Sequence, residues 1–182
     1  SEEDGLSKHL LSGLNPSGVP KGLKDTVYGF EYNNFEQLEE IVMSDKNNFA
    51  AIKMEVKRNV DPQDNFLENV RKLATENNIV LIFDECTSGF RETNGGLHKK
   101  FNVNPDIAIF GKALGNGHAI TSVLGIREVM QAAQSTFISS TFWTERLGPA
   151  AALKTLEIME REKSWITITN NGKSIIKRWK DL

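Results

Sequence analysis

The 182-residue sequence has little cysteine and no long hydrophobic run, and each shortage limits what the protein can be. Cys86 is the only cysteine, so the chain forms no internal disulfide, and we expect a reducing compartment. No apolar run approaches the roughly 18 residues that a membrane span needs. Residues 1–13 lack the basic and apolar regions of a secretory signal. We therefore expect a cytoplasmic protein, with a plastid or mitochondrial location after removal of a transit peptide as the alternative.

An excess of charge of one sign is also lacking. The sequence has 22 Lys and Arg residues against 24 Asp and Glu residues, which gives a net charge of −2 at pH 7. Such a chain has no electrostatic basis for binding nucleic acid or an anionic membrane. Apolar residues make up 39% and charged residues 25%, which is ordinary for a globular protein. We expect a small-molecule partner, and a length that suits one domain or one domain with part of another.

Hydrophobic periodicity predicts strands that alternate with helices. Residues 1–34 are rich in Gly, Pro, Ser and Asn, which indicates an irregular segment with one short strand at Thr26–Phe30. The other predicted strands are Phe49–Val56, 79–83, 106–110, Ile120–Ile126 and Phe137–Ser140. The predicted helices are Phe35–Met43 with Asn34 as N-cap, Asp64–Asn77 with Asp64 as cap, Arg127–Ala133, Arg146–Arg161 and Trp165–Leu182. This alternation is typical of the α/β class, a three-layer α/β/α arrangement around a mostly parallel sheet.

Two of the predicted strands end close to an ionisable residue. Val80–Phe83 leads directly into Asp84, and Ile107–Phe110 leads through a glycine to Lys112. Open α/β sheets bind ligands at the C-terminal ends of their strands. An acid there is either a solvated or capping residue, or the magnesium-binding Asp of a nucleotide hydrolase. The hydrolase requires a GxxxxGK[ST] loop, which the sequence lacks. We predict no metal site.

A third interpretation is a site for pyridoxal 5'-phosphate (PLP). A carboxylate such as Asp84 beside the pyridine nitrogen keeps that nitrogen protonated, so that the ring withdraws electrons. A lysine that forms the Schiff base must lose its proton, and burial lowers a lysine pKa from its usual value of about 10.4. We expect such burial for Lys112, where Gly111, Gly115 and Gly117 let a flat cofactor approach the backbone. A surface lysine in a glycine-rich turn is the alternative that these residues leave open.

Three longer segments resemble a known family. They are FDECTSGFR at 83–91, NPDIAIFGKALGNG at 104–117 and SSTFWTERLGPAAALKTLEIM at 139–159. In order and spacing they resemble class III PLP-dependent aminotransferases of fold type I. The likeness extends over residues 16–160. Within this class, the GFR residues and the string Pro16–Lys21 make the sequence most similar to glutamate-1-semialdehyde 2,1-aminomutase-like members.

The resemblance implies roles for four residues near the strand ends. Lys112 would form the Schiff base and move the proton, and Asp84 would pair with the pyridine nitrogen. Cys86 stands where a valine usually packs on the ring, and we expect it to act as a small apolar side chain. Glu55 matches a family glutamate on the substrate side, with a generic strand-end acid as the alternative.

The same resemblance implies a second subunit. Thr141, with Ser140 before it, would bind the phosphate of a cofactor held by the neighbouring chain, so we expect at least a homodimer. The sequence departs from the family pattern at Val56, Asn116, His118, Trp143, Glu145 and Arg146. These departures concern the loops after the first strand, after Lys112 and after Thr141. We assign His118 no role.

The resemblance covers the middle of a large domain. Residues 1–162 would form the central part of the PLP-binding domain, and residues 163–182 would form a helix that leads toward a C-terminal small domain. We expect a piece of a longer enzyme with little activity of its own, and a naturally short protein is the alternative. The predicted function is a class III aminotransferase acting on a small amine or amino acid. The alternatives are a glutamate-1-semialdehyde 2,1-aminomutase, and a catalytically incomplete binding or assembly module.

Overall fold

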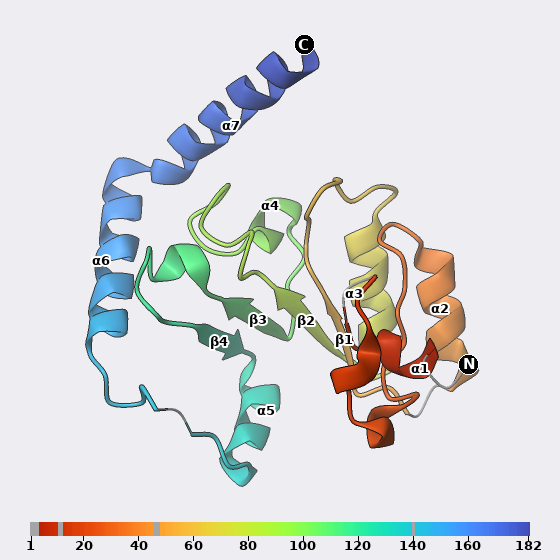
Figure 1. The fold of residues 1–182 in the computed structure, drawn as a ribbon. Coiled ribbons are helices and arrows are strands. Elements are labelled where there is room, and N and C mark those ends of the chain that lie inside the picture. The colour runs from red at the N-terminus through yellow and green to blue at the C-terminus, as the bar shows by residue number, and fades with distance from the viewer. Residues whose placement is uncertain (1–3, 11–12, 46–47, 140) are drawn as a thin grey trace. The chain divides into compact units, whose positions relative to one another are not determined.

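The computed structural model describes residues 4–10, 13–45, 48–139 and 141–182, which divide into two compact units, Ser1–Lys46 and Asn47–Leu182. The first unit contains α1 (Asp4–Ser7), 3₁₀ turns at Pro16–Gly18 and Lys21–Leu23, and α2 (Phe35–Ser44), as Figure 1 shows. Helix α2 confirms the prediction, and its cap is the expected one. The side chain of Asn34 accepts a hydrogen bond from the backbone N–H of Gln37 at 3.1 Å.

The strand predicted at Thr26–Phe30 is wrong, since residues 26–30 form no strand. The backbone N–H of Thr26 donates to the carbonyl of Leu23 at 3.2 Å, and the Thr26 hydroxyl donates to the same oxygen at 2.7 Å. These bonds close a local turn, and threonine favours such turns because its hydroxyl competes with the backbone of a sheet.

The second unit contains a four-stranded sheet in the order β1-β2-β3-β4 (Figure 1). Strands β1 (Ala51–Met54), β2 (Val80–Asp84) and β3 (Ile107–Phe110) are parallel, and β4 (Ser122–Gly125) runs antiparallel to β3. The helices are α3 (Phe66–Glu76), α4 (His98–Phe101), α5 (Arg127–Met130), α6 (Leu147–Glu162) and α7 (Ser164–Lys180). The chain therefore has the predicted α/β fold, with a mostly parallel sheet flanked by helices.

Three further details of the prediction differ from the structure. Helix α3 begins after Asn65 rather than after Asp64, because both residues adopt left-handed backbone angles that end the preceding turn. The strand expected at Phe137–Ser140 is absent from residues 137–139, and Ser140 lies outside the described residues. The short helix predicted at Arg127–Ala133 divides into α5 and the 3₁₀ segment Gln131–Ser135.

The two faces of the sheet differ in burial. One face carries the buried side chains Ile52, Met54, Leu81, Phe83, Ala108 and Phe110. At β3 this face packs with Phe90, Leu114 and residues of α6. The opposite face carries the exposed or half-buried side chains Lys53, Ile82, Asp84, Ile107 and Ile109. Asp84 thus belongs to the more open face.

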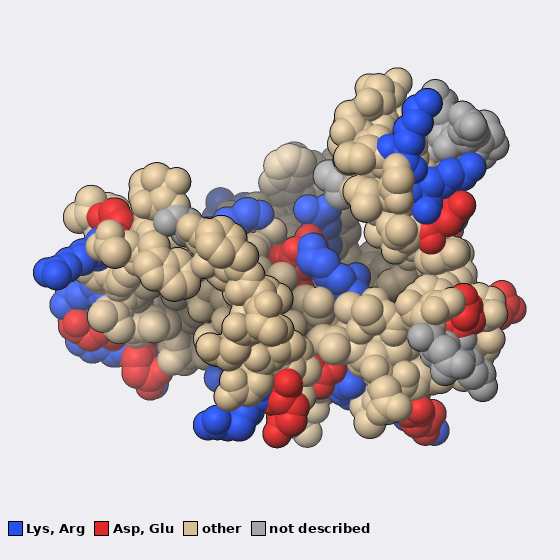
Figure 2. Space-filling view, turned by 90° about the horizontal axis from the view of Figure 1, so that it is seen from below, with Lys and Arg blue, Asp and Glu red and all other residues tan. Residues whose placement is uncertain are grey.

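Charged groups of both signs are distributed over the surface shown in Figure 2, where blue and red side chains are scattered among larger uncharged areas. This distribution agrees with the nearly balanced composition. None of the described helices is both long and apolar enough to cross a bilayer.

Candidate active site

The ends of β2 and β3 lie side by side at one edge of the sheet. Asp84 is the last residue of β2 and pairs in register with Ile109, which lies three residues before Lys112. Lys112 begins the 3₁₀ turn Lys112–Leu114 that follows β3. Because the strands are parallel, their order and register bring an acid and an amine to the same strand-end edge.

The carboxylate of Asp84 is held on both oxygens. Its Oδ2 lies 3.0 Å from the Nζ of Lys53 on β1, and its Oδ1 accepts a hydrogen bond from the backbone N–H of Cys86 at 3.2 Å. Burial raises the pKa of Asp84, but the hydrogen bonds from Lys53 and Cys86 outweigh burial and hold that pKa below its ordinary value. Asp84 is therefore a carboxylate at neutral pH.

Lys112 extends from a strained backbone. Its φ angle is 42°, in the left-handed region that side chains other than Asn and Asp rarely adopt. Its Nζ donates a hydrogen bond to the hydroxyl of Thr87 at 2.6 Å. The burial that we expected is not found, because the Lys112 residue is exposed in the described chain. Strand β3 ends at Phe110, so Lys112 already belongs to the 3₁₀ turn that follows the sheet.

Cys86 lies beside the backbone of Gly111. A Cβ added at Gly111 would be 3.4 Å from the Sγ of Cys86 and 3.5 Å from Cγ2 of Thr121, which is ordinary van der Waals contact with both side chains. Burial and the nearby Asp84 carboxylate raise the pKa of the Cys86 thiol, while the charges of Lys112 and Lys53 act in the opposite direction. A protonated thiol agrees with the predicted role as a small apolar side chain, which stays a prediction.

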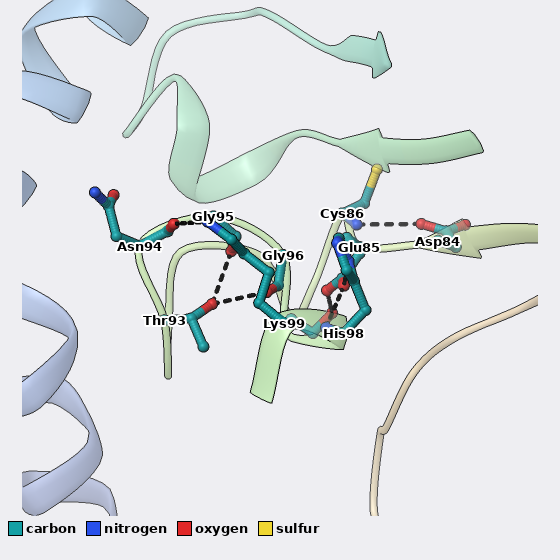
Figure 3. A network of polar contacts seen from close by, with 10 residues as sticks. Asp84, Glu85, Cys86, Thr93, Asn94, Gly95, Gly96, His98 and Lys99 are labelled. Atoms are coloured by element: carbon teal, nitrogen blue, oxygen red, sulfur yellow. Dashed lines mark hydrogen bonds and ion pairs between the residues drawn. The ribbon is translucent and has the colours of Figure 1, made fainter. Parts of the chain in front are cut away.

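Glu85 points to the other side of the strand and is completely buried. Its Oε1 accepts hydrogen bonds from the backbone N–H of His98 at 2.9 Å and from Nδ1 of His98 at 2.8 Å, and Ser88 donates to Oε2. In Figure 3, Glu85 and His98 point toward one another, and the sulfur of Cys86 points away from them. Through Ser88 and His98, Glu85 therefore holds both ends of the loop of residues 86–97, which contains Thr87.

The other predicted residues form no hydrogen bond or ion pair with Asp84 or Lys112 among the described residues. Glu55 follows β1 as expected, but its carboxylate lies 3.3 Å from Nε of Arg58 in an ion pair. Thr141 is exposed in the turn before α6, and no contact joins it to Asp84 or Lys112 within the described part of the chain. Ser140 lies outside the described residues.

Two contacts at the site were missed from the sequence, namely Lys53 with Asp84 and Thr87 with Lys112. A signal existed for Lys53, because a lysine between the apolar residues Ile52 and Met54 marks the polar side of a strand. The sequence offered no comparable signal for Thr87, whose contact depends on how the loop folds back toward β3.

The arrangement fits a flat cofactor that has a cationic ring nitrogen and a reactive carbonyl group. Asp84 supplies an ionised acceptor, Lys112 supplies an exposed amine, and Gly111 leaves the space that a Cβ would fill. An amine forms an imine with a carbonyl, and a carboxylate stabilises a protonated ring nitrogen.

Comparison with known proteins gives a consistent result. The model of the family described as aminotransferase class-III matches residues 25–182. The chain is 39% identical over 166 residues to a 3-aminobutyryl-CoA aminotransferase from Cloacimonas acidaminovorans, which covers 86% of this chain and 39% of that protein. It is 33% identical over 164 residues to a glutamate-1-semialdehyde 2,1-aminomutase from Nitrosopumilus maritimus, covering 87% and 38%. The chain thus spans about two fifths of the length of these relatives.

Solved structures agree with the fold. The FumI protein of Sphingopyxis sp. MTA144, whose structure contains PLP, matches with a TM-score of 0.75 and 25% identity, covering 79% of this chain and 36% of that one. An ornithine aminotransferase from Toxoplasma gondii matches with a TM-score of 0.66 and 29% identity, covering 74% and 32%.

Proposed function

Because this chain belongs to the class-III aminotransferase family, we propose that the complete protein transfers an amino group with PLP held between Asp84 and Lys112. The observation that supports this proposal most directly is the position of an ionised Asp84 and an exposed, strained Lys112 at adjacent ends of parallel strands. When bound, PLP supplies an aldehyde that condenses with amines and a ring that withdraws electrons from the substrate.

Each residue of the site has a distinct task in the proposal. Asp84 accepts a hydrogen bond from the protonated ring nitrogen. Lys112 anchors the cofactor through its Nζ and, once released by the substrate amine, takes and returns the substrate proton. Thr87 orients that Nζ by its 2.6 Å hydrogen bond. Cys86 fills space on one side of the ring, and Glu55 lies toward the substrate.

Chemical trapping of the lysine tests the proposal. The complete protein with PLP should show a visible absorbance band, and borohydride should convert it into a permanent label on a peptide that contains Lys112. Lys112→Ala should show neither the band nor the label. Lys72→Ala should keep both, because Lys72 is an exposed lysine that pairs with Glu76 on α3. A label on another lysine, or wild-type protein without a band, would contradict the proposal.

The aminomutase is the second candidate, and the 33% identity to a protein of that name over 87% of this chain favours it. An aminomutase exchanges amino and oxo groups within one molecule, whereas an aminotransferase needs a separate keto-acid acceptor. We expect turnover of a small amine or amino acid to depend on an added keto acid. Turnover of a single amino-aldehyde substrate without an acceptor would instead identify the aminomutase.

We also propose that the complete protein is at least a homodimer, in which Ser140 and Thr141 of one chain bind the cofactor phosphate of the other. Exposed large apolar side chains support this proposal on both sides of Thr141. They are Phe137, Ile138, Phe142, Trp143, Leu147 and Leu153. Exposed large apolar side chains gathered around one segment are typical of a protein interface.

A further inference from the structure

Lys53 places a charge where the sequence of β1 is otherwise apolar. The neighbouring Ile52 and Met54 point to the packed face of the sheet and are buried. Lys53 pairs in register with Ile82, two residues before Asp84 on the adjacent strand, so its side chain lies on the same open face as Asp84. The two side chains meet there, with Nζ 3.0 Å from Oδ2.

The two partners of this ion pair differ in burial, and the more buried one is the carboxylate of Asp84. The Lys53 side chain is 58% exposed, whereas the Asp84 side chain is only 26% exposed. An ion pair between two exposed side chains contributes little, but a carboxylate that is largely removed from water depends more on its partner. Besides Lys53, Asp84 is contacted by Cys86 through both its backbone N–H and its thiol. The charge of Lys112, at the end of β3, acts on the Cys86 thiol.

We propose that Lys53 is a positioning residue that keeps Asp84 ionised and oriented for a protonated cofactor nitrogen. With Oδ2 fixed by Lys53 and Oδ1 by the backbone of Cys86, the carboxylate cannot rotate freely. A less basic Asp84 leaves the shared proton on the ring nitrogen, where it supports electron withdrawal. The identity of the ligand rests on the proposed function, whereas the effect of Lys53 on Asp84 does not.

The charge state of Asp84 can be read without any cofactor. The Cys86 amide donates to Oδ1, so its ¹H–¹⁵N NMR signal reports protonation of Asp84. In the complete protein labelled with ¹⁵N-cysteine, the signal is assigned through its loss in Cys86→Ser and followed as the pH is lowered. We expect the signal of Lys53→Met to start moving at higher pH than that of the wild type. Lys53→Arg, which keeps the charge and the donor, should behave like the wild type.

Lys72→Met is the matched control, since it removes an exposed lysine that pairs on α3 rather than with Asp84. Its Cys86 signal should titrate as in the wild type. The proposal is overturned if the Cys86 signal of Lys53→Met moves at the same pH as that of the wild type. It is also overturned if the Cys86 signal of Lys53→Arg moves at the same pH as that of Lys53→Met. Circular dichroism at neutral pH establishes that each variant is folded before it is titrated.

A second measurement uses the loaded protein. As the pH is lowered, Lys53→Met should lose its visible cofactor band at higher pH than the wild type, the Lys53→Arg variant and the Lys72→Met control. Loss of the visible band at the same pH in all four proteins would overturn the proposal. If no protein binds PLP, the proposed function fails, while the cofactor-free titration still decides the role of Lys53.

Discussion

Glu85 is a charged residue buried next to the site. Its carboxylate is completely buried and accepts hydrogen bonds from Ser88 and from two nitrogen atoms of His98. Burial raises the pKa of Glu85, but these hydrogen bonds outweigh burial and hold the pKa below its ordinary value. Glu85 anchors the loop that contains Thr87, so it supports the contact of Lys112 without touching the lysine.

Replacing Glu85 should destabilise the protein more than removing one of its donors. Glu85→Gln turns one acceptor oxygen into an NH₂ group that faces donors, and we expect the free energy of unfolding to fall by about 2–3 kcal/mol. Ser88→Ala removes a single hydroxyl and should lower it by only about 1 kcal/mol. Urea unfolding at pH 7 measures both effects. Equal stability of Glu85→Gln and the wild type would show that the buried network contributes nothing.

The pH dependence of stability provides a separate test of Glu85. Its pKa in the folded protein lies below the value in the unfolded chain, so the unfolded chain binds more protons in the acid range. The contribution of Glu85 is therefore complete above the unfolded pKa and is lost as the pH falls toward the folded pKa. The urea midpoints of wild type and Glu85→Gln, measured from pH 7 downward, should converge. Parallel curves would contradict the ionised state of Glu85.

At the scale of elements, the glycines of α6 and α7 form a matched pair. A Cβ at Gly148 in α6 would lie 2.7 Å from the carbonyl oxygen of Ala119 and 3.1 Å from Cβ of Ile120. A Cβ at Gly172 in α7 would meet no atom within 4 Å apart from the backbone of its own helix and its chain neighbours. Glycine at the start of α6 thus lets the helix approach the segment that precedes β4.

Alanine at these two positions should change the free energy of unfolding in opposite directions. Gly172→Ala should raise the free energy of unfolding by up to about 1 kcal/mol, because alanine favours a helix over glycine. Gly148→Ala should lower it by about 1–3 kcal/mol, since the close contact forces the backbone of α6 to move. Thermal and urea unfolding of the two variants compare them directly. Stabilisation by Gly148→Ala would contradict the close packing of α6.

Elements with strong local signals could be predicted from the sequence, and elements that depend on distant partners could not. Helix α2 has both an apolar stripe and the Asn34 side chain to cap it, and both signals are local. The strands that contain Asp84 and lead to Lys112 are continuous apolar runs. Residues 26–30 and 137–139 also contain residues of high strand propensity but form no strand, because a strand also needs a neighbouring backbone to pair with.

The candidate site shows the same division. The motifs indicated Asp84 and Lys112, and the parallel register brings their strands together. The contact between Lys53 and Asp84 depends on the register of β1 against β2. A shift of one residue would move the Lys53 side chain to the opposite face of the sheet. The exposure of Lys112 could not be read from its apolar surroundings in sequence, because the chain leaves the sheet immediately after Phe110.

At the scale of the whole molecule, the segment around Thr141 exposes large apolar side chains that a second chain could cover. Phe137 is 94% exposed, and Phe142 and Trp143 are 64% and 67% exposed. We expect the wild type to be a dimer in light scattering after size exclusion. The double variant Phe142→Asp, Trp143→Asp should be monomeric, because charges disfavour an apolar interface. Trp179→Asp on α7 is the control and should remain dimeric.

Mixed dimers test whether Thr141 completes the partner's site. Lys112→Ala and Thr141→Ala chains are co-expressed with different affinity tags, and the mixed dimer is purified. If Thr141 acts across the interface, one site of that dimer combines an intact Lys112 with an intact Thr141, and the other site lacks both. The mixed dimer should then bind PLP, measured by its visible band, at about half the wild-type amount per dimer, with one of two sites intact. If Thr141 serves its own chain, every site carries one defect, and the mixed dimer should bind no more PLP than the average of the two variants.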